Sequence, residues 1–508
     1  MVVCYIITRA LDLPHHTLHK STTMVSIGDL PVELLLTIFK LIYDDDDTEV
    51  NNLGDDFFVE GGYPEPSLHA SMCQIEDDLH NPTLFPMTIA FVCHHWRDIL
   101  AKSPEYWNKV VFDVGRDPTP LLDAFSWSND QLLDVLVWNR IPDLTPAGKA
   151  LENERVSAIT QSLTPHFHRC CRIRYEVTYS SSLPSIATIF RTTPYILRQF
   201  VLEPRVDDIQ YDNSTNLTSM EVDDNVTQFS SLSVLSLGAR LFIDLGRAGW
   251  LHNLRSDAYL TLTISQFRFQ QQKRYGDDER YTLLEFLNHL AAMPQPDVLR
   301  LRNLSLSYEP GISTTDSKYS LKPTSLCLDN LGENILTEFF KKTILSCDSI
   351  YINRCTIPWI DCSLISSYLY LDNIGYIHNI SNILWVWQGS HLSLESCAAF
   401  DDDLLDRLED EGRNWCLKLL TDLTLKNCIN FTSAGLRKLM ILQKAMAAAE
   451  DNQVVLDRVS VEGGRLSLWE DDISWFRQQR GSTDVSWTII HPDGTYAYPL
   501  NHYRLGED

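Results

Sequence analysis

The side chains most able to do chemistry gather near residue 170. His166, His168, Cys170 and Cys171 fall within six residues and are all possible metal ligands. A closed zinc site usually takes ligand pairs from two separate places in a chain, and no second pair with such spacing occurs here. We therefore expect a structural or surface role for these residues and no metal site.

The other chemical motifs point away from catalysis. The acidic run at 401–403 is expected to open a helix, where carboxylates oppose the helix dipole, and the run at 409–411 is expected to form a solvated polar face. The sequence contains no glycine-rich phosphate loop, no Gly-x-Ser-x-Gly elbow and no His-Glu-x-x-His motif. An enzyme would need such a constellation, so we expect no catalytic residues and no cofactor.

Charge and composition limit the class of partner. The 508 residues include 42 Lys and Arg against 68 Asp and Glu, which gives a net charge of −26. A polyanion is bound through an excess of cations, so we do not expect nucleic acid as a partner. No apolar run approaches the roughly 18 residues that a membrane helix needs, and the first residues lack the pattern of a secretory signal. The 12 scattered cysteines then predict a reducing cytoplasmic or nuclear location with free thiols.

Two amphipathic helices are predicted near the N-terminus. From Leu30 to Ile42 apolar residues recur at the spacing of one helix face, and Pro31 suits the first turn. The segment 43–82 is acidic, has no Lys or Arg and shows no periodicity, so we expect a solvated loop insertion. A second helix, which should end before Ser103-Pro104, carries a single apolar face made of Ile89, Val92, Cys93, Trp96, Ile99 and Leu100.

Beyond about residue 113 short apolar strands alternate with helices, which are expected at 281–293, 333–345, 401–420 and 433–449. The strands share a Leu-x-Leu pattern followed by a polar residue or a cysteine, as in Leu299-x-Leu301-x-Asn303 and Leu423-x-Leu425-x-x-Cys428. They begin 19 to 36 residues apart, and most of these intervals fit leucine-rich repeats whose leucines point inward.

The polar residue or cysteine after each strand is expected to lie where the chain bends inward. It should stack on its equivalents in neighbouring repeats, and an asparagine there could satisfy backbone amides that are otherwise buried without partners. The alternative is an ordinary α/β domain whose buried strands happen to contain Leu-x-Leu.

The N-terminal motifs closely resemble the F-box, and most of all the fungal F-box-like proteins with leucine-rich repeats. The resemblance lies in the pattern Leu30-Pro31-x-Glu33-Leu34-x-x-x-Ile38-Phe39, followed by Val92-Cys93-x-x-Trp96 and by Trp107. It implies an α/β fold in which a helical F-box is joined to an irregular leucine-rich-repeat-like solenoid. The expected segments are an extension at 1–25, an F-box at 26–112 with an acidic insertion at 43–82, an α/β region with any repeats degenerate at 113–298, a repeat region at 299–465 and a C-terminal cap at 466–508.

The resemblance also implies a function. An F-box docks on the Skp-type adaptor of a cullin–RING (SCF) ubiquitin ligase, while the repeats hold a target protein. The chain would then be a non-catalytic recognition subunit that reaches the cullin scaffold through the adaptor. The alternative is a repeat-bearing interaction scaffold whose F-box-like end only caps the fold. By position, the adaptor-binding residues would be Leu30, Pro31, Glu33, Leu34, Ile38, Phe39, Val92, Cys93, Trp96 and Trp107.

Overall fold

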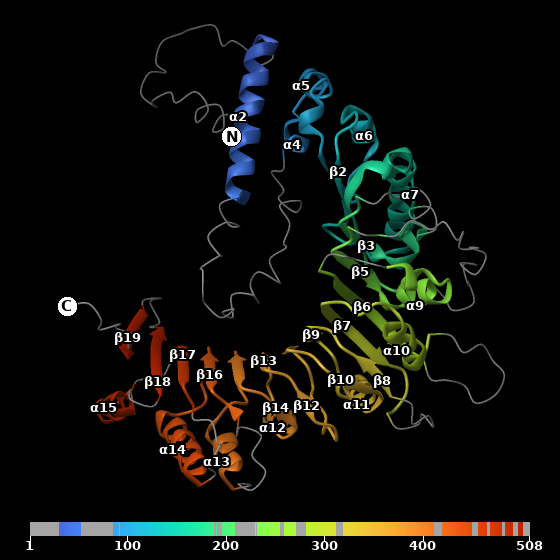
Figure 1. The fold of residues 1–508 in the computed structure, drawn as a ribbon. Helices are drawn as coiled ribbons and strands as arrows, with labels where there is room; N and C mark the ends of the chain where they lie inside the picture. Colours follow the sequence, from blue (N-terminus) through green and yellow to red (C-terminus); the bar gives the residue numbers. More distant parts are fainter. Residues whose placement is uncertain are drawn as a thin grey trace, which may run out of the picture. The chain divides into compact units, whose positions relative to one another are not determined.

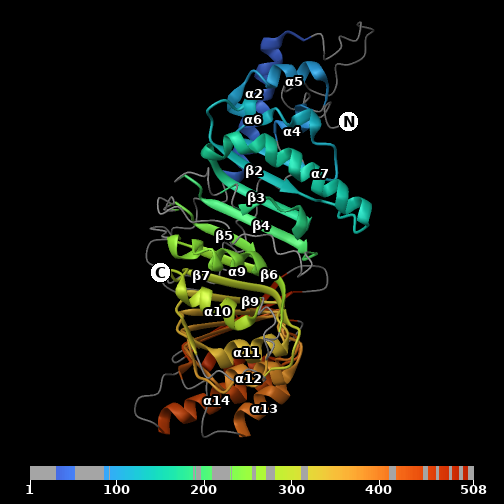
Figure 2. The same ribbon diagram turned by 90° about the vertical axis from the view of Figure 1, so that its right-hand side faces the viewer.

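The structure is a computed structural model with mixed helix and strand and a large parallel sheet, which confirms the α/β part of the expected fold class (Figures 1 and 2). The chain divides into two compact units, Met1–Phe200 and Val201–Asp508. The residues described are 30–51, 85–90, 92–186, 189, 196–208, 229, 231–254, 259–270, 281–310, 318–410, 419–449, 456–464, 468–479, 483–490 and 496–500.

The first unit opens with a group of helices, here called the helical head, made of α2 (Val32–Asn51), α4 (Met87–Ala90), α5 (His94–Leu100) and the 3-10 turn η3 (Pro104–Tyr106). Helix α2 begins directly after Pro31 and buries only part of the apolar face predicted for it, because Leu35 and Ile38 are buried whereas Leu34 and Leu41 are exposed. The helix runs on to Asn51, which corrects the loop expected to start at 43. The remainder of that predicted insertion, 52–82, lies outside the described residues.

The second predicted helix is divided, and this changes which of its residues are buried. Cys93 has an extended backbone, with φ −162 and ψ 165, and α5 starts only after it. A single helical face therefore does not extend from Ile89 to Leu100. Val92 and Cys93 are exposed, which corrects the expectation that both pack inward, whereas Trp96 is buried as expected.

The rest of the first unit contains the parallel strands β1 (Lys109–Asp113), β2 (Leu133–Trp138) and β3 (Cys170–Tyr179). Helix α7 (Pro146–Leu163) is anchored by the buried Glu152, whose carboxylate accepts hydrogen bonds from the backbone N–H groups of Thr178 and Tyr179. Burial opposes ionisation, but these hydrogen bonds and one from Asn139 keep the pKa of Glu152 below its usual value. The shorter elements are η4 (Thr119–Leu121), α6 (Ala124–Trp127), η5 (Thr164–Arg169) and η6 (Ser180–Ser182). 

In the second unit the main strands pair in chain order, all of them parallel except the last. They are β5 (Val234–Gly238), β6 (Thr261–Phe269), β7 (Val298–Leu306), β9 (Ser325–Asp329), β11 (Ser349–Asn353), β13 (Tyr368–Asp372), β15 (His391–Glu395), β16 (Asp422–Lys426), β17 (Arg458–Gly464), β18 (Asp484–Ile490) and β19 (Tyr496–Leu500). β4 (Gln199–Val206) spans the division between the two units. Two short pairs, β8 (Tyr319–Leu321) with β10 (Thr343–Leu345) and β12 (Leu364–Ile365) with β14 (Trp387–Gln388), lie beside the helices.

The helices of the second unit lie on one face of its sheet (Figures 1 and 2). The Leu side chains of the Leu-x-Leu strands are buried on that face, while the residues between them alternate to the other side, which we call the open face. Helix α14 has the predicted bounds, whereas α11 ends at Lys342 and its last predicted residues form β10 instead. The helices are α9 (Ala239–Arg247), α10 (Leu283–Ala292), α11 (Glu333–Lys342), α12 (Ile377–Leu384), α13 (Asp402–Asp410), α14 (Ser433–Ala449) and α15 (Glu470–Gln478), with the turn η8 (Trp250–Asn253).

One backbone conformation recurs at the end of these strands. The residue four places after the first Leu or Ile has a φ between 52 and 54, in the left-handed region, and from Asn330 to Asn427 its N–H donates to the carbonyl of the next strand. Asn373 donates to Glu395 over 2.9 Å and Asn427 donates to Glu462 over 2.8 Å. The residues with this φ are Asn303, Asn330, Arg354, Asn373, Ser396 and Asn427, and Gln266 on β6 has a φ of 54 at the same offset.

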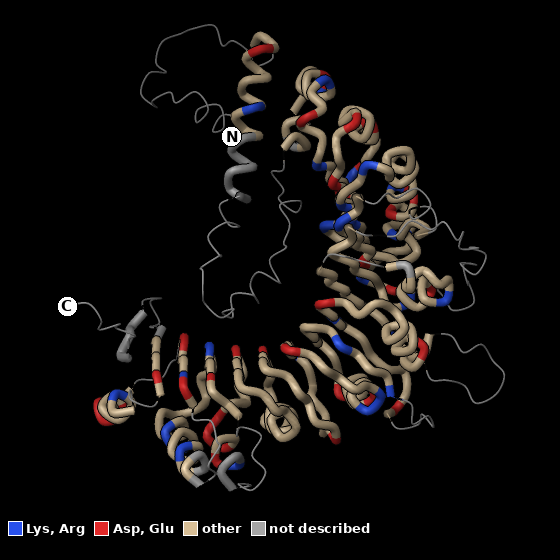
Figure 3. Tube along the Cα trace, in the orientation of Figure 1, with Lys and Arg blue, Asp and Glu red and all other residues tan. Residues whose placement is uncertain are grey.

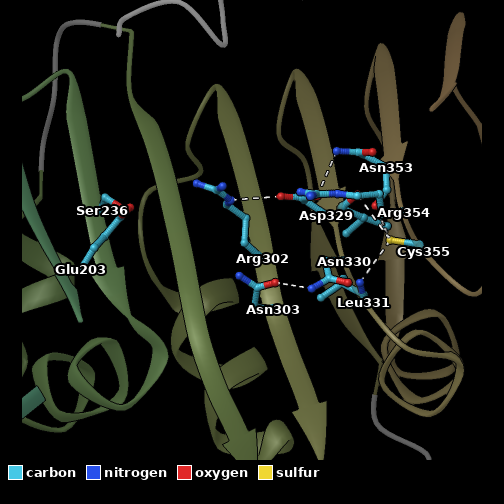
Figure 4. A network of polar contacts seen from close by, with 11 residues as sticks. Glu203, Ser236, Arg302, Asn303, Asp329, Asn330, Leu331, Asn353, Arg354 and Cys355 are labelled. Carbon is cyan, nitrogen blue, oxygen red and sulfur yellow. Dashed lines mark hydrogen bonds and ion pairs between the residues drawn. The ribbon is translucent and has the colours of Figure 1, made fainter. Parts of the chain in front are cut away.

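The asparagines and the cysteines after the strands therefore occupy two different positions, contrary to the expectation that they share one. The left-handed asparagines are largely solvent-facing, and Asn330 donates to the side chain of Asn303 rather than covering buried amides (Figure 4). The cysteines come one residue later and are buried, with Cys397 Sγ 3.3 Å from the carbonyl oxygen of Leu371 on the preceding strand. The residues in this buried position are Phe267, Leu304, Leu331, Cys355, Ile374, Cys397 and Cys428.

The left-handed position makes a prediction about stability. Asn427→Ile should destabilise the second unit by about 1–2 kcal/mol, because a β-branched residue is strained at positive φ. Asn427→Gly should change stability by no more than a few tenths of a kcal/mol. The neighbouring exposed strand residue provides a control, Lys426→Ile, and urea denaturation should find it close to the wild type. Equal losses for the two isoleucine variants would show that positive φ is not the cause.

Candidate functional site

The core of the helical head is a cluster of aromatic rings drawn from separate helices. Phe39 on α2 meets Trp96 on α5 edge to face, with ring centroids 5.3 Å apart. Phe85 packs on Tyr106 at 5.0 Å, and Tyr43 packs on both of these rings. These contacts complete a core between segments that lie more than forty residues apart in the sequence.

Four of the residues predicted to bind an adaptor belong to this interior instead. Ile38 is 7% exposed, and Phe39, Trp96 and Trp107 are buried almost completely. Trp107 donates its indole N–H to the carbonyl of Leu100 over 2.8 Å and packs on Trp127. In the structure these side chains hold the helices together, and their contact with an adaptor stays a prediction.

The other predicted residues face solvent. Leu34 is 53% exposed, Val92 is 41% exposed, and Pro31, Glu33 and Cys93 are also exposed, while Leu30 is half-buried. Leu41, which the sequence reasoning placed on the buried face, is 48% exposed. It follows Leu34 by two helical turns and so shares its side of α2. We call Leu30, Pro31, Glu33, Leu34, Leu41, Val92 and Cys93 the head surface.

The head surface is apolar without being needed for the fold. The core rings of Phe39, Phe85, Trp96 and Tyr106 are buried, whereas about half of the Leu34, Leu41 and Val92 side chains stays in contact with solvent. Single exposed apolar residues are common, but Leu34 and Leu41 on one side of α2, together with Val92 in the turn before α5, leave apolar area that another polypeptide could cover. The geometry thus supports docking of a protein partner.

The open face of the second unit carries a different kind of surface. Tyr351 and Tyr370 lie opposite each other in the register of β11 and β13, with parallel rings 4.3 Å apart. Tyr368 stacks on His391 at the same distance, and His391 Nε2 lies 3.3 Å from a carboxylate oxygen of Asp422. Burial raises the pKa of Tyr351 and of Tyr370, so both phenols stay protonated at neutral pH.

Charged residues beside this surface are paired in part. Asp329 on β9 accepts from Arg302 over 3.1 Å, from Arg354 over 2.8 Å and from Asn353 over 3.0 Å (Figure 4). Two arginines thus pair with a single carboxylate, so this end of the open face carries no excess negative charge. 

Several buried thiols are held in their protonated form, and the described residues contain no cluster of metal-ligand side chains. Burial raises the pKa of Cys355 and of Cys397 to about 12 and that of Cys428 to about 11, so these thiols stay protonated. Burial also raises the pKa of Cys170 to about 12. Among the described residues no three His, Cys, Asp or Glu side chains are placed to hold a metal ion. None of the described helices has the length and apolarity to span a membrane.

Comparison with known proteins does not add to this geometry. No protein-family model matches the sequence, and no curated protein matches it either.

The burial pattern predicts how the head responds to substitution. Trp96→Ala should destabilise the first unit by about 3–5 kcal/mol, because it leaves a cavity beside Phe39. Trp96→Phe should lose much less, since a ring remains and the indole N–H has no hydrogen-bond partner among the described residues. Leu34→Ala should lie within about 0.5 kcal/mol of the wild type in thermal unfolding. A large loss for Leu34→Ala would contradict its assignment to the surface.

Proposed function

We propose that the chain is a non-catalytic substrate-recognition subunit of an SCF-type ubiquitin ligase. In this proposal the helical head is an F-box that binds the Skp-type adaptor, and through it the cullin scaffold. The second unit is a leucine-rich-repeat-like solenoid that holds a target protein. The observation that carries the proposal is the head surface, where apolar side chains remain exposed beside a completed aromatic core.

The energetics of the head surface favour a stable contact. Covering the exposed part of Leu34, Leu41 and Val92 would contribute about 1 kcal/mol or more for each side chain. The aromatic core keeps α2 and α5 in place before a partner arrives, so little conformational entropy is lost on binding. Adaptor contact is accordingly assigned to the exposed residues of the F-box-like motif and not to Phe39 or Trp96.

The second unit supports the other half of the proposal. The left-handed turn recurs from Gln266 to Asn427, which favours repeats that start before residue 299. A sheet with helices on one face and an open face on the other offers a broad surface for a protein target. The chain would act by proximity, holding the target near a separate enzyme that transfers ubiquitin in the cytoplasm or nucleus.

A second function is favoured by one observation, the burial of four motif residues. If the motif serves only to build a cap, the chain is a protein-interaction scaffold that never binds the adaptor. The two functions differ in the role of Leu34. It contacts the adaptor if the chain is a ligase subunit, and it has no partner contact if the chain is a scaffold.

Leu34→Asp tests this difference directly. It should reduce binding to purified Skp-type adaptor at least tenfold, because a carboxylate would be desolvated at the contact. Leu132→Asp is a matched control, since Leu132 is also 53% exposed and lies outside the helical head. Calorimetric titration should show adaptor binding for the wild type and for the control. Absence of binding by folded wild-type protein would favour the scaffold.

A further inference from the structure

The stacked rings of the second unit form a continuous aromatic platform on its open face. Tyr351 stacks on Tyr370 and Tyr368 stacks on His391, and the rings of Tyr368 and Tyr370 are nearly parallel at 6.3 Å. The platform spans β11, β13 and β15. Tyr351 is 9% exposed, and the other three side chains are half-buried, so ring surface remains in contact with solvent.

A row of small hydroxyl residues continues from the platform in the same register. The row begins beside Tyr370, and its side chains are all half-buried. Short side chains leave the face lower here than at the platform, which gives room for the side chains of a bound polypeptide. The row consists of Ser393, Thr424, Ser460 and Ser486 on β15 to β18.

Charged residues border the hydroxyl row on both sides, two residues before it on β16 to β18 and two residues after it on β15 to β17, and Asp372 on β13 continues the second row beside Tyr370 (Figure 3). The carboxylates in these rows outnumber the cations. Lys426 already pairs with Glu395 at 3.3 Å, and Arg458 lies 3.7 Å from Asp422. The carboxylates are Asp372, Glu395, Asp422, Glu462 and Asp484, and the Lys and Arg side chains are Lys426 and Arg458.

We propose that this face, from the aromatic platform to β18, binds an extended segment of a partner protein that is rich in arginine or lysine. The proposal rests on the proposed function, in which the second unit holds a protein target, and it adds the chemistry of the target. A guanidinium or ammonium group would lie over the Tyr370 and Tyr368 rings, and further cations would be attracted to the carboxylates beside the hydroxyl row, which outnumber the Lys and Arg side chains there. 

The dimensions suit a short segment. Neighbouring strands lie about 4.8 Å apart, so the face from β11 to β18 measures about 24 Å across the strands. An extended chain covers that distance with about seven residues. A nucleic acid would meet the same carboxylates unfavourably, so charge selects a basic polypeptide.

The experiment uses the full chain and a fluorescein-labelled peptide of alternating arginine and serine, about ten residues long. Fluorescence anisotropy should show binding that weakens as salt rises from about 50 to about 500 mM, because screening reduces these attractions. A peptide in which glutamate replaces arginine should not bind. Tyr370→Ala should weaken the arginine peptide about fivefold, and Tyr370→Phe should retain most of the affinity because it keeps the ring.

A pair of carboxylate variants separates a local contact from net charge. Glu395→Gln removes a carboxylate that pairs with Lys426 on the open face, and should weaken the peptide several-fold. Asp406→Asn removes one that pairs with Lys438 on the helix side, and should have no effect. Equal effects of the two variants, or equal binding of the acidic peptide, would overturn the proposal.

Leu34→Asp distinguishes this inference from the proposed function. It should leave peptide binding unchanged while it removes adaptor binding. Peptide binding by a wild-type chain that ignores the adaptor would refute the ligase function and keep the basic target. Adaptor binding with no preference for the basic peptide would keep the ligase function and refute the basic target.

Discussion

The second unit depends on the left-handed residue that ends its strands. At that residue the backbone turns inward, and its N–H reaches the carbonyl of the neighbouring strand at 2.8 to 3.0 Å from Asn330 to Asn427. The turn directs the following Leu, Ile or Cys into the core and leaves the residues between the strand leucines on the open face. Because each bond joins one strand to the next, the register is fixed along the sheet. The alignment of Tyr351 with Tyr370, and of His391 with Asp422, follows from that register.

The helical head also keeps part of its surface exposed, but for a different physical reason. Its aromatic rings satisfy one another, so Leu34 and Val92 are not drawn into the interior. The motif that resembles an F-box therefore contains two kinds of residue. Phe39 and Trp96 position the helices, and Leu34 stays exposed beside them. Under the proposed function, this separation would let a short segment fold stably and still offer apolar side chains to another protein.

Periodicity in the sequence predicted much of the fold but less of the surfaces. The positions of helix α14 and of the Leu-x-Leu strands could be predicted because they depend on the spacing of nearby apolar residues in the sequence. The break at Cys93 could not be seen, because Val92 and Cys93 keep the apolar spacing and only the backbone angles interrupt the helix. The exposure of Leu41 depends on which side of α2 packs against Phe85 and Trp96, and this side is set by tertiary contacts that the local sequence does not reveal. The ring stack was missed since neither Tyr351 nor Tyr370 is notable until strand pairing brings them opposite each other.

Hydrogen–deuterium exchange of the full chain, with and without purified Skp-type adaptor, is the most direct test of the central claim. If the head surface binds the adaptor, amide exchange should slow in α2 around Leu34 and in the segment from Val92 into α5. Exchange in the strands of the second unit should stay unchanged. Slower exchange confined to the open face, or no change in the helical head at saturating adaptor, would contradict the account.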